Sequence, residues 1–308
     1  MRDVLQSLER WSAEGRRFAL ATVIDTWGSS PRPTGSVMAV RDDGLVCGSV
    51  SGGCVEGAVI QEAMAALKDG RPRRLKFGAA DAQTLWEVGL ACGGGIEVFV
   101  EPDPDRQKPH LWQEIVAQIR NNERCAVTID LATGERLNGI EPAPDRFVQE
   151  FPPRERLLIF GASHIAVPLV GLAKTLGFES VLADPRSQLL VLERFPVPPD
   201  RTLPMWPDEA LRQVDLTPDT FAVVLSHDPK IDDAALAILL RSPVAYIGAL
   251  GSRTTQAKRR QDLAALGFTE EELDRIHGPV GLEIGAATPE EIALSIAAQI
   301  VQVRRAPR

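Results

Sequence analysis

The chain has few cysteines, no metal-site spacing and no long apolar run. Its 308 residues include four cysteines, Cys47, Cys54, Cys92 and Cys125. These are too few for a disulfide framework in a chain of this length, and we expect them to stay reduced in the cytoplasm. No two cysteines have zinc-site spacing, and the four histidines lie far apart. No apolar run approaches the roughly 18 residues of a membrane span. A membrane protein is therefore disfavoured, as is a metal held directly by the protein, whereas a metal carried inside a cofactor remains open.

The chain is also short of positive charge. Its formal net charge is −8 and its isoelectric point is near 5.2, which disfavours a general binder of nucleic acids or anionic membranes. The first 18 residues are amphipathic and carry acids, so they do not match the apolar core of a signal peptide. A hydrophobic fraction of 44% with 25% charged residues is typical of an ordinary globular protein.

The length fits two domains. The segment 141–155, EPAPDRFVQEFPPRE, carries four prolines and several charges, so we interpret it as an interdomain linker with the boundary near 150. In domain 1–150, a helix at about 3–14 precedes short strands and further helices, which predicts a compact α+β fold. In domain 151–308, apolar strands alternate with helices near 231–241, 253–266 and 289–303. This alternation predicts a Rossmann-like, doubly wound parallel sheet.

Two of the cysteines stand beside glycine-rich turns, in SVSGGCVEG and LACGGGIEV. Glycine lets backbone N–H groups approach a ligand without a Cβ in the way. The first turn runs into a predicted helix, whose N-terminus favours an anion and a thiolate. The candidate binding residues of these turns are Ser51, Gly52, Gly53, Cys54, Cys92, Gly93 and Gly94. The alternative interpretation is that both cysteines are small buried apolar side chains.

The clearest candidate site in the second domain is the turn GASHIA at 161–166, between the first strand and the first helix. Dinucleotide-binding folds place their phosphate loop there, and Asp184 follows 23 positions after Gly161, where a carboxylate can hold ribose hydroxyls. Ser163 replaces the second glycine of the usual fingerprint and crowds a diphosphate, although its hydroxyl could bond a phosphate oxygen. His164 lies beside it. The alternative is a Rossmann-like scaffold with a degenerate site.

Two further segments end strands at what should be the same edge. Ser226, His227 and Asp228 close the strand FAVVLSHD, where a histidine is either a ligand contact or part of a turn cap. The next strand leads to candidate anion-binding residues at Gly251, Ser252 and Arg253. The three cations that follow, at 258–260, we interpret as a solvated helix face. We expect all of these strand ends to line one crevice.

Several of these motifs together resemble the XdhC/CoxI family of xanthine dehydrogenase accessory factors. GSSPRPTGSVMAV, GSVSGGCVEG and LACGGG resemble its N-terminal domain. LLIFGASHIA, LSHD, YIGALGSR and RIHGPVGLEIGAATPEEIALSI resemble its C-terminal Rossmann domain. The resemblance runs from about 11 to 303 in the same order. Ser163 departs from the glycine expected in the family's turn, and Cys47 occupies a position not associated with the family.

The resemblance implies a molybdenum cofactor chaperone without turnover of its own. Such a protein holds the molybdopterin cofactor, supports its sulfuration with a cysteine desulfurase and delivers it to a xanthine dehydrogenase-like molybdoenzyme. Cys54 and Cys92 would be neighbours of the molybdenum, and Arg32 would be the cation for the phosphate. A homodimer would suit such a handover.

Two alternatives from other classes remain open at this point. One is an NAD(P)-dependent oxidoreductase with His227 or His277 as its acid or base. The other is a thiol redox protein that uses Cys54 and Cys92.

Overall fold

The computed structural model describes residues 1–30, 32–78 and 94–306. The chain divides into two compact units, Met1–Pro153 and Arg154–Arg308, and each is described by itself. The predicted linker is wrong in part. Residues 146–151 form strand β8 (Arg146–Phe151), which pairs with β6 (Cys125–Asp130) inside the first unit. The prolines on either side of this strand suggested a flexible link, but its alternating side chains find a partner strand.

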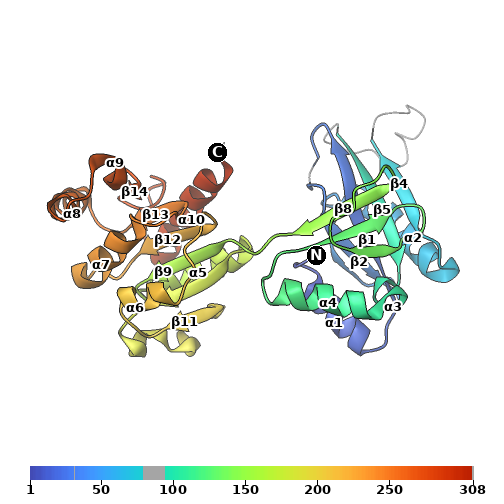
Figure 1. Ribbon diagram of the computed structural model, residues 1–308, viewed down its shortest axis with the longest axis horizontal. Coiled ribbons are helices and arrows are strands. Elements are labelled where there is room, and N and C mark those ends of the chain that lie inside the picture. The colour runs from blue at the N-terminus through green and yellow to red at the C-terminus, as the bar shows by residue number, and fades with distance from the viewer. Residues whose placement is uncertain (31, 79–93, 307–308) are drawn as a thin grey trace. The chain divides into compact units, whose positions relative to one another are not determined.

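An antiparallel five-stranded sheet forms the centre of the N-terminal unit, in the order β3-β2-β1-β5-β4 (Figure 1). The strands are β1 (Phe18–Trp27), β2 (Val37–Arg41), β3 (Val46–Gly48), β4 (Arg73–Phe77) and β5 (Gly95–Pro102). A second sheet has the order β7-β6-β8, with β7 at Arg136–Asn138.

Helices cover both faces of the five-stranded sheet. Helix α2 (Glu56–Asp69) packs on one face through Val59, Ala63 and Ala66. Helices α1 (Leu5–Ala13) and α4 (Pro109–Arg120) belong to the core of the other face, with the short α3 (Pro104–Gln107) before α4. These contacts confirm the predicted α+β character, because each helix buries one apolar stripe against strands.

The C-terminal unit is built on a six-stranded parallel sheet in the order β11-β10-β9-β12-β13-β14. The strands are β9 (Arg156–Phe160), β10 (Glu179–Ala183), β11 (Arg201–Leu203), β12 (Thr220–Val224), β13 (Tyr246–Ala249) and β14 (Ile276–His277). The chain starts in the middle at β9, steps outward to β11, and then returns to β12 on the other side of β9. This is the Rossmann strand order, and it confirms the predicted doubly wound fold.

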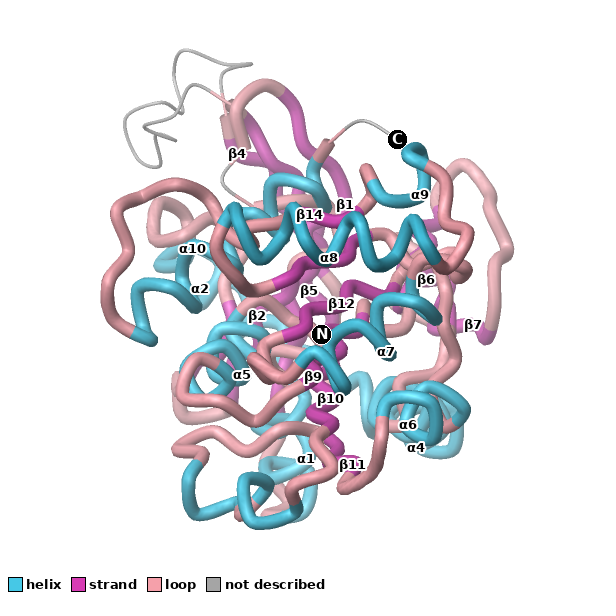
Figure 2. Tube along the Cα trace, turned by 90° about the vertical axis from the view of Figure 1, so that its left-hand side faces the viewer, coloured by secondary structure: helices cyan, strands magenta, loops and turns pink. Residues whose placement is uncertain are grey.

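Helices lie on both faces of this sheet, as Figure 2 shows. Helices α5 (Ala166–Thr175) and α10 (Pro289–Arg305) share one core, and α6 (Pro207–Arg212) and α7 (Pro229–Leu239) belong to the other, together with parts of α8 (Arg253–Ala265) and α9 (Glu270–Leu273). Two 3-10 turns, Ser187–Leu190 and Leu192–Arg194, follow β10.

Local signals explain where the last helix starts. The Thr288 hydroxyl accepts the Glu291 N–H, and the Glu291 carboxylate accepts the Thr288 N–H, which is the reciprocal pair called a capping box.

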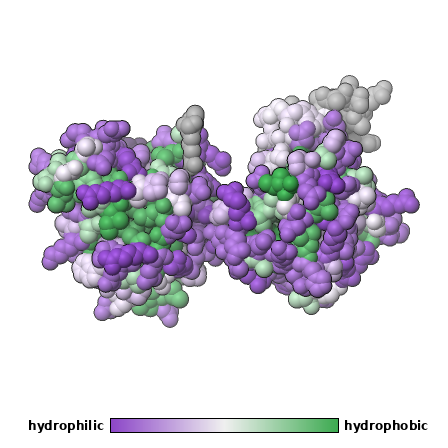
Figure 3. Space-filling model, viewed as in Figure 1, coloured by the Kyte–Doolittle hydropathy of each residue, from purple (hydrophilic) through white to green (hydrophobic). Residues whose placement is uncertain are grey.

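Exposed large apolar side chains are scattered over the surface, and the face in Figure 3 shows apolar areas set among hydrophilic residues. Among the described residues, no helix has the length and apolar character needed to cross a membrane.

Candidate functional site

The first candidate loop, residues 49–54, connects β3 to α2 in the N-terminal unit. Gly52 and Gly53 have φ angles of 82° and 127°, a region that side chains rarely adopt, so the glycines are required for this turn. The turn directs the backbone N–H groups of Ser51, Gly52 and Gly53 toward one point. The N-cap of α2 is Val55, and Cys54 lies one residue before it with an exposed side chain.

The anion in this loop is the chain's own Glu56. Its carboxylate accepts the backbone N–H groups of Ser51, Gly52 and Gly53 at 2.8–3.0 Å and that of Val50 at 3.3 Å. It also accepts the hydroxyl of Ser49 at 2.7 Å, and that of Ser51 at 2.5 Å. Burial raises the pKa of this carboxyl group, but the hydrogen bonds outweigh that effect and lower the pKa to about 2.

This arrangement corrects the expectation that the loop is an open anion cradle. The donors are there, but Glu56 already occupies them, so what the loop presents to solvent is the Cys54 side chain. Sequence reasoning missed Glu56. Its signal was an acid directly after the turn, at the first position of the helix, where a carboxylate favours the helix dipole and can bond back to the turn.

The other predicted residues of this unit are in different situations. Cys92 and Gly93 lie outside the described residues, so their expected proximity to Cys54 is untested. Gly94 packs tightly, since a Cβ there would lie 2.2 Å from the Ser29 carbonyl oxygen. Arg32 bonds the Asp3 carboxylate at 3.3 Å, and its Nε is buried with no partner in the described part of the chain.

The two cysteines outside the glycine turns, Cys47 and Cys125, are sheltered from solvent. Cys125 is buried and Cys47 is half-buried, and burial raises the pKa of both thiols.

The second candidate site is the turn after β9 in the C-terminal unit. Gly161 has a φ of 99°, and a Cβ there would lie 2.4 Å from the backbone nitrogen of Ser226. The turn after β9 therefore lies directly against the end of β12, at the point where the strand order reverses. Open parallel sheets bind ligands at this switch point.

The Asp184 carboxylate, predicted to hold ribose hydroxyls, bonds to its own chain. It is fully buried, and it accepts the Ala162 N–H at 2.8 Å together with the Arg186 backbone N–H and guanidinium. Burial raises the pKa of Asp184, but the bonds from Arg186 and Ala162 outweigh it, and the pKa is lowered. Asp184 therefore holds the turn in place, because its oxygens already have donors from the protein.

The two polar residues of the turn behave differently. The Ser163 hydroxyl oxygen is buried and makes no hydrogen bond within the residues that the structure describes. His164 is exposed. Arg194, which carries no local signal in the sequence, donates to the Ala162 carbonyl at 3.1 Å and so fixes the turn from the other side.

The loop after β12 is held by a buried network. Ser226 donates its hydroxyl to Asp232 at 2.6 Å. The pKa of Asp232 is raised, because the effect of burial outweighs that of the hydrogen bonds from Ser226. Asp228 caps α7 by accepting the Lys230 N–H, so this loop does supply a helix cap. His227 is exposed with a φ of 62°, a conformation that is uncommon for any residue other than glycine.

The residues after β13 mainly start helix α8. Ser252 is its N-cap and accepts the Thr255 N–H, while Gly251 has a φ of 133° and Arg253 is exposed.

The interpretation of 258–260 as a solvated face is wrong for Arg259. Its guanidinium is buried and bonds Asp233 at 2.9 Å and Asp232 at 3.5 Å.

The ends of β9, β10 and β12 meet at one edge of the sheet. Hydrogen bonds to Asp184 raise the pKa of Arg186, and the nearby charges of Asp228 and Asp232 add to this effect. Arg186 is tied to the β9 turn through Asp184, whose Oδ2 also accepts the Ala162 N–H. The structure thus brings Gly161, Ser163 and Asp184 together beside Arg186, and Gly161 lies against Ser226 at the end of β12.

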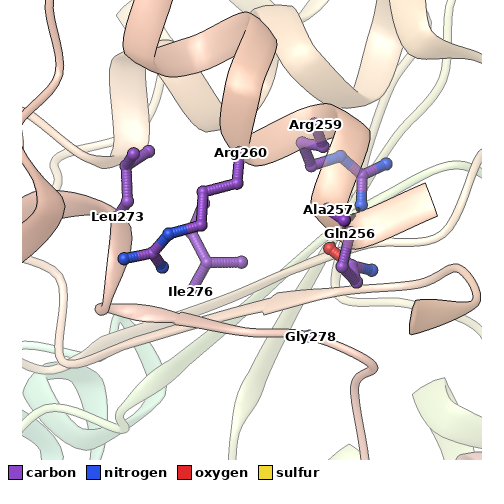
Figure 4. A pocket seen from close by; sticks show the side chains of 7 residues that line it. All are labelled: Gln256, Ala257, Arg259, Arg260, Leu273, Ile276 and Gly278. Atoms are coloured by element: carbon purple, nitrogen blue, oxygen red, sulfur yellow. Dashed lines mark hydrogen bonds between the residues drawn. The ribbon is translucent and has the colours of Figure 1, made fainter. Parts of the chain in front are cut away.

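Two hollows lie elsewhere. One of about 150 Å³ lies under α8, where Arg260 extends between Leu273 and Ile276 (Figure 4). Glu270 and Asp274 already pair with that guanidinium. The other, of about 380 Å³, is lined by residues of α1 and α4, including Trp112. None of the predicted site residues lines either hollow.

His277, the acid or base of the oxidoreductase alternative, is stacked on Tyr246 with ring centroids 4.7 Å apart. Burial lowers the pKa of this histidine.

Comparisons with known proteins agree with this architecture. The model of the XdhC Rossmann domain matches residues 157–300, and that of the XdhC and CoxI family matches residues 11–78. A crystal structure of a xanthine dehydrogenase from Bacillus halodurans superposes with a TM-score of 0.83 at 28% identity, covering 99% of this chain and 96% of that one.

Three curated relatives are similar over nearly the whole chain. The molybdenum cofactor insertion chaperone PaoD of Escherichia coli K12 is 30% identical, covering 98% of this chain and 88% of PaoD. The uncharacterised Escherichia coli K12 protein YqeB is 32% identical over 93% of this chain but only 43% of YqeB. A probable xanthine dehydrogenase subunit of Bacillus subtilis 168 is 28% identical, covering 93% of each chain. With both family models in the expected order and a relative aligned from end to end, the chain belongs to the XdhC and CoxI family.

Proposed function

We propose that this protein binds the molybdenum cofactor and delivers it to a xanthine dehydrogenase-like molybdoenzyme. The observation that carries the proposal is the 30% identity to a molybdenum cofactor insertion chaperone over 98% of the chain. The cofactor is cargo, so the protein needs groups that hold it reversibly and no machinery for turnover.

The C-terminal sheet edge suits the phosphate of the cargo. Gly161 lets the backbone come close, the Ser163 hydroxyl lacks a partner among the described residues, and the Arg186 guanidinium adds positive charge. A phosphate oxygen accepts hydrogen bonds from both kinds of donor. These groups hold the anionic end of the cargo while leaving its metal centre free.

The N-terminal loop offers an exposed thiol as a candidate contact. The exposed Cys54 offers a sulfur ligand, and such ligands bind soft metal centres. Glu56 fills the loop's N–H cradle, so this loop leaves those backbone donors unavailable to a phosphate. We include Cys92 as a second neighbour of the molybdenum, and a cysteine desulfurase as the partner that supplies sulfur in the cytoplasm. A homodimer suits this handover.

The oxidoreductase alternative has less support. A dehydrogenase needs a carboxylate open to the ribose and room for the diphosphate. Asp184 is buried and Ser163 carries a side chain where the fingerprint has glycine. The thiol redox alternative requires Cys92 close to Cys54.

The test is the content of protein purified from a molybdenum-replete host, with molybdenum measured by elemental analysis and pterin by fluorescence after oxidation. We expect both in the wild type, and about tenfold less molybdenum in Cys54→Ala, with Cys47→Ala as the control that retains it. Bound nicotinamide without molybdenum would support the oxidoreductase, and a reversible Cys54–Cys92 disulfide without either would support the redox protein.

A further inference from the structure

We propose that Arg186 makes the carboxyl edge of the C-terminal sheet selective for a ligand that ends in a phosphate monoester. The inference deepens the proposed function, on which it rests for the identity of the cargo. It concerns the end of the second strand, where nucleotide-binding sheets place a carboxylate that accepts ribose hydroxyls. Asp184 has that position here, but Arg186 is the group that remains open.

Asp184 is closed to an external hydroxyl. Its Oδ1 accepts the backbone N–H and the Nε of Arg186, both at 2.9 Å. Its Oδ2 accepts the Ala162 N–H and the Nη2 of Arg186, both at 2.8 Å. With the side chain fully buried, a ribose would have to displace these donors, and each loss would leave a buried polar group unpaired.

Arg186 is fixed but still accessible. Two of its guanidinium nitrogens hold Asp184, and yet 42% of the side chain is exposed. A guanidinium is planar and presents donors on more than one edge. With one edge anchored on Asp184, another edge is pre-organised for the oxygens of a phosphate group.

The guanidinium lies next to the β9 turn. Its Nη2 and the Ala162 N–H bond the same carboxylate oxygen, which places them within two hydrogen-bond lengths of each other. Ser163 is the next residue, and its buried hydroxyl oxygen has no partner in the described part of the chain. A phosphate oxygen would satisfy that hydroxyl while it pairs with Arg186.

The same residues disfavour a diphosphate. Ser163 stands where the dinucleotide fingerprint has the glycine that lets a diphosphate approach the backbone. The edge therefore suits one terminal phosphate, with selectivity of about tenfold to a hundredfold, the range of a charge-assisted hydrogen bond.

Two ligands end in a phosphate monoester. One is the pterin cofactor, and the other is NADPH, which carries this group at the 2′ position of a ribose. The first arm of the experiment measures pterin and molybdenum retained by the full chain after purification and dialysis. The second arm measures dissociation constants for NADPH and NADH, which differ only by the phosphate monoester, using isothermal titration.

The variants separate charge from folding. Arg186→Gln leaves the buried Asp184 carboxylate unpaired, so it is accompanied by the double variant Asp184→Asn with Arg186→Gln. The asparagine keeps an oxygen for the Ala162 N–H. The matched control is Arg156→Gln, because Arg156 also joins β9 to β10 through Glu179 but at the opposite end of the strands.

We expect the double variant to retain about tenfold less pterin than the control, with an unchanged circular dichroism spectrum. If the wild type retains no pterin, a preference for NADPH over NADH that disappears in the double variant would keep the Arg186 inference and overturn the pterin cargo. The inference itself is overturned if the wild type retains the pterin cofactor and the double variant retains as much. It is also overturned if the wild type binds neither the pterin nor NADPH better than NADH.

Discussion

The two glycine turns of this protein are alike in sequence but differ in what they leave open. Both lead from a strand to a helix, and both use glycines at positive φ. In the loop at 49–54, the Glu56 carboxylate takes four backbone N–H groups and two hydroxyls. In the turn at 161–164, Asp184 takes one N–H, and the Ser163 hydroxyl has no partner among the described residues.

The difference shows that a glycine turn supplies hydrogen-bond donors, but the turn alone does not determine whether an internal carboxylate or a ligand accepts those bonds. In the first turn, Glu56 accepts the backbone N–H groups, so these hydrogen bonds hold the backbone that precedes Cys54. The second satisfies only part of its polar groups from within, so it can still gain bonds from a ligand. Buried polar groups without partners are costly, which favours a ligand at the second turn.

The largest predicted loss of stability comes from adding a Cβ to the more tightly packed of the two turns. Gly161→Ala should destabilise the C-terminal unit by about 3 kcal/mol or more, because its Cβ would lie 2.4 Å from the Ser226 nitrogen at a positive φ. Gly52→Ala has the same kind of backbone but no atom within 4 Å of the added Cβ, so about 1 kcal/mol is expected. Urea unfolding measures both, and equal losses would mean that the close approach at Gly161 is unimportant.

Removing the internal anion should be next in size. Glu56→Gln should destabilise the N-terminal unit by about 2 kcal/mol, because an amide cannot accept from all the donors that the carboxylate holds. Glu62→Gln is the matched control on the same helix, since its carboxylate has one ion pair, with Arg73, and about 0.5 kcal/mol or less is expected. Denaturant unfolding compares the two, and similar losses would contradict the role given to Glu56.

The contribution of Glu56 should also depend on pH. The pKa of this group falls from 4.5 to about 2 on folding, so the folded state binds the proton less tightly than the unfolded state. The stabilisation is therefore complete above pH 4.5 and is lost as the pH falls through about 2. The stability difference between the wild type and Glu56→Gln should shrink over that range, as unfolding at a series of pH values would show. A difference that stays constant would contradict this assignment.

The fold was largely predictable because it depends on periodic patterns. Alternating apolar strands and helices predicted the parallel sheet and a last helix near 289–303. The position of β8 was missed, because prolines at both ends masked a short strand whose partner, β6, lies well before it in the chain.

The site was predictable only in its location. The sequence placed the turn residues and Asp184 at one edge, but it could not show that Asp184 faces inward to Ala162 and Arg186. The same holds for Glu56 and Arg259, whose roles depend on the direction of a long side chain. Such directions are decided by tertiary hydrogen bonds, which no local pattern records.

The smallest effect on stability is expected at the residue that we consider most important for the cargo. Cys54 is exposed on a loop that Glu56 already holds, so Cys54→Ala should change the free energy of unfolding by less than about 0.5 kcal/mol. Cys125→Ala removes a buried thiol from the core and should cost about 1 kcal/mol. Urea unfolding of both variants, beside their molybdenum content, tests whether stability and cargo binding are separate. If Cys54→Ala were the less stable of the two and still retained molybdenum, the thiol would be a structural group and the N-terminal loop would have no part in holding the cargo.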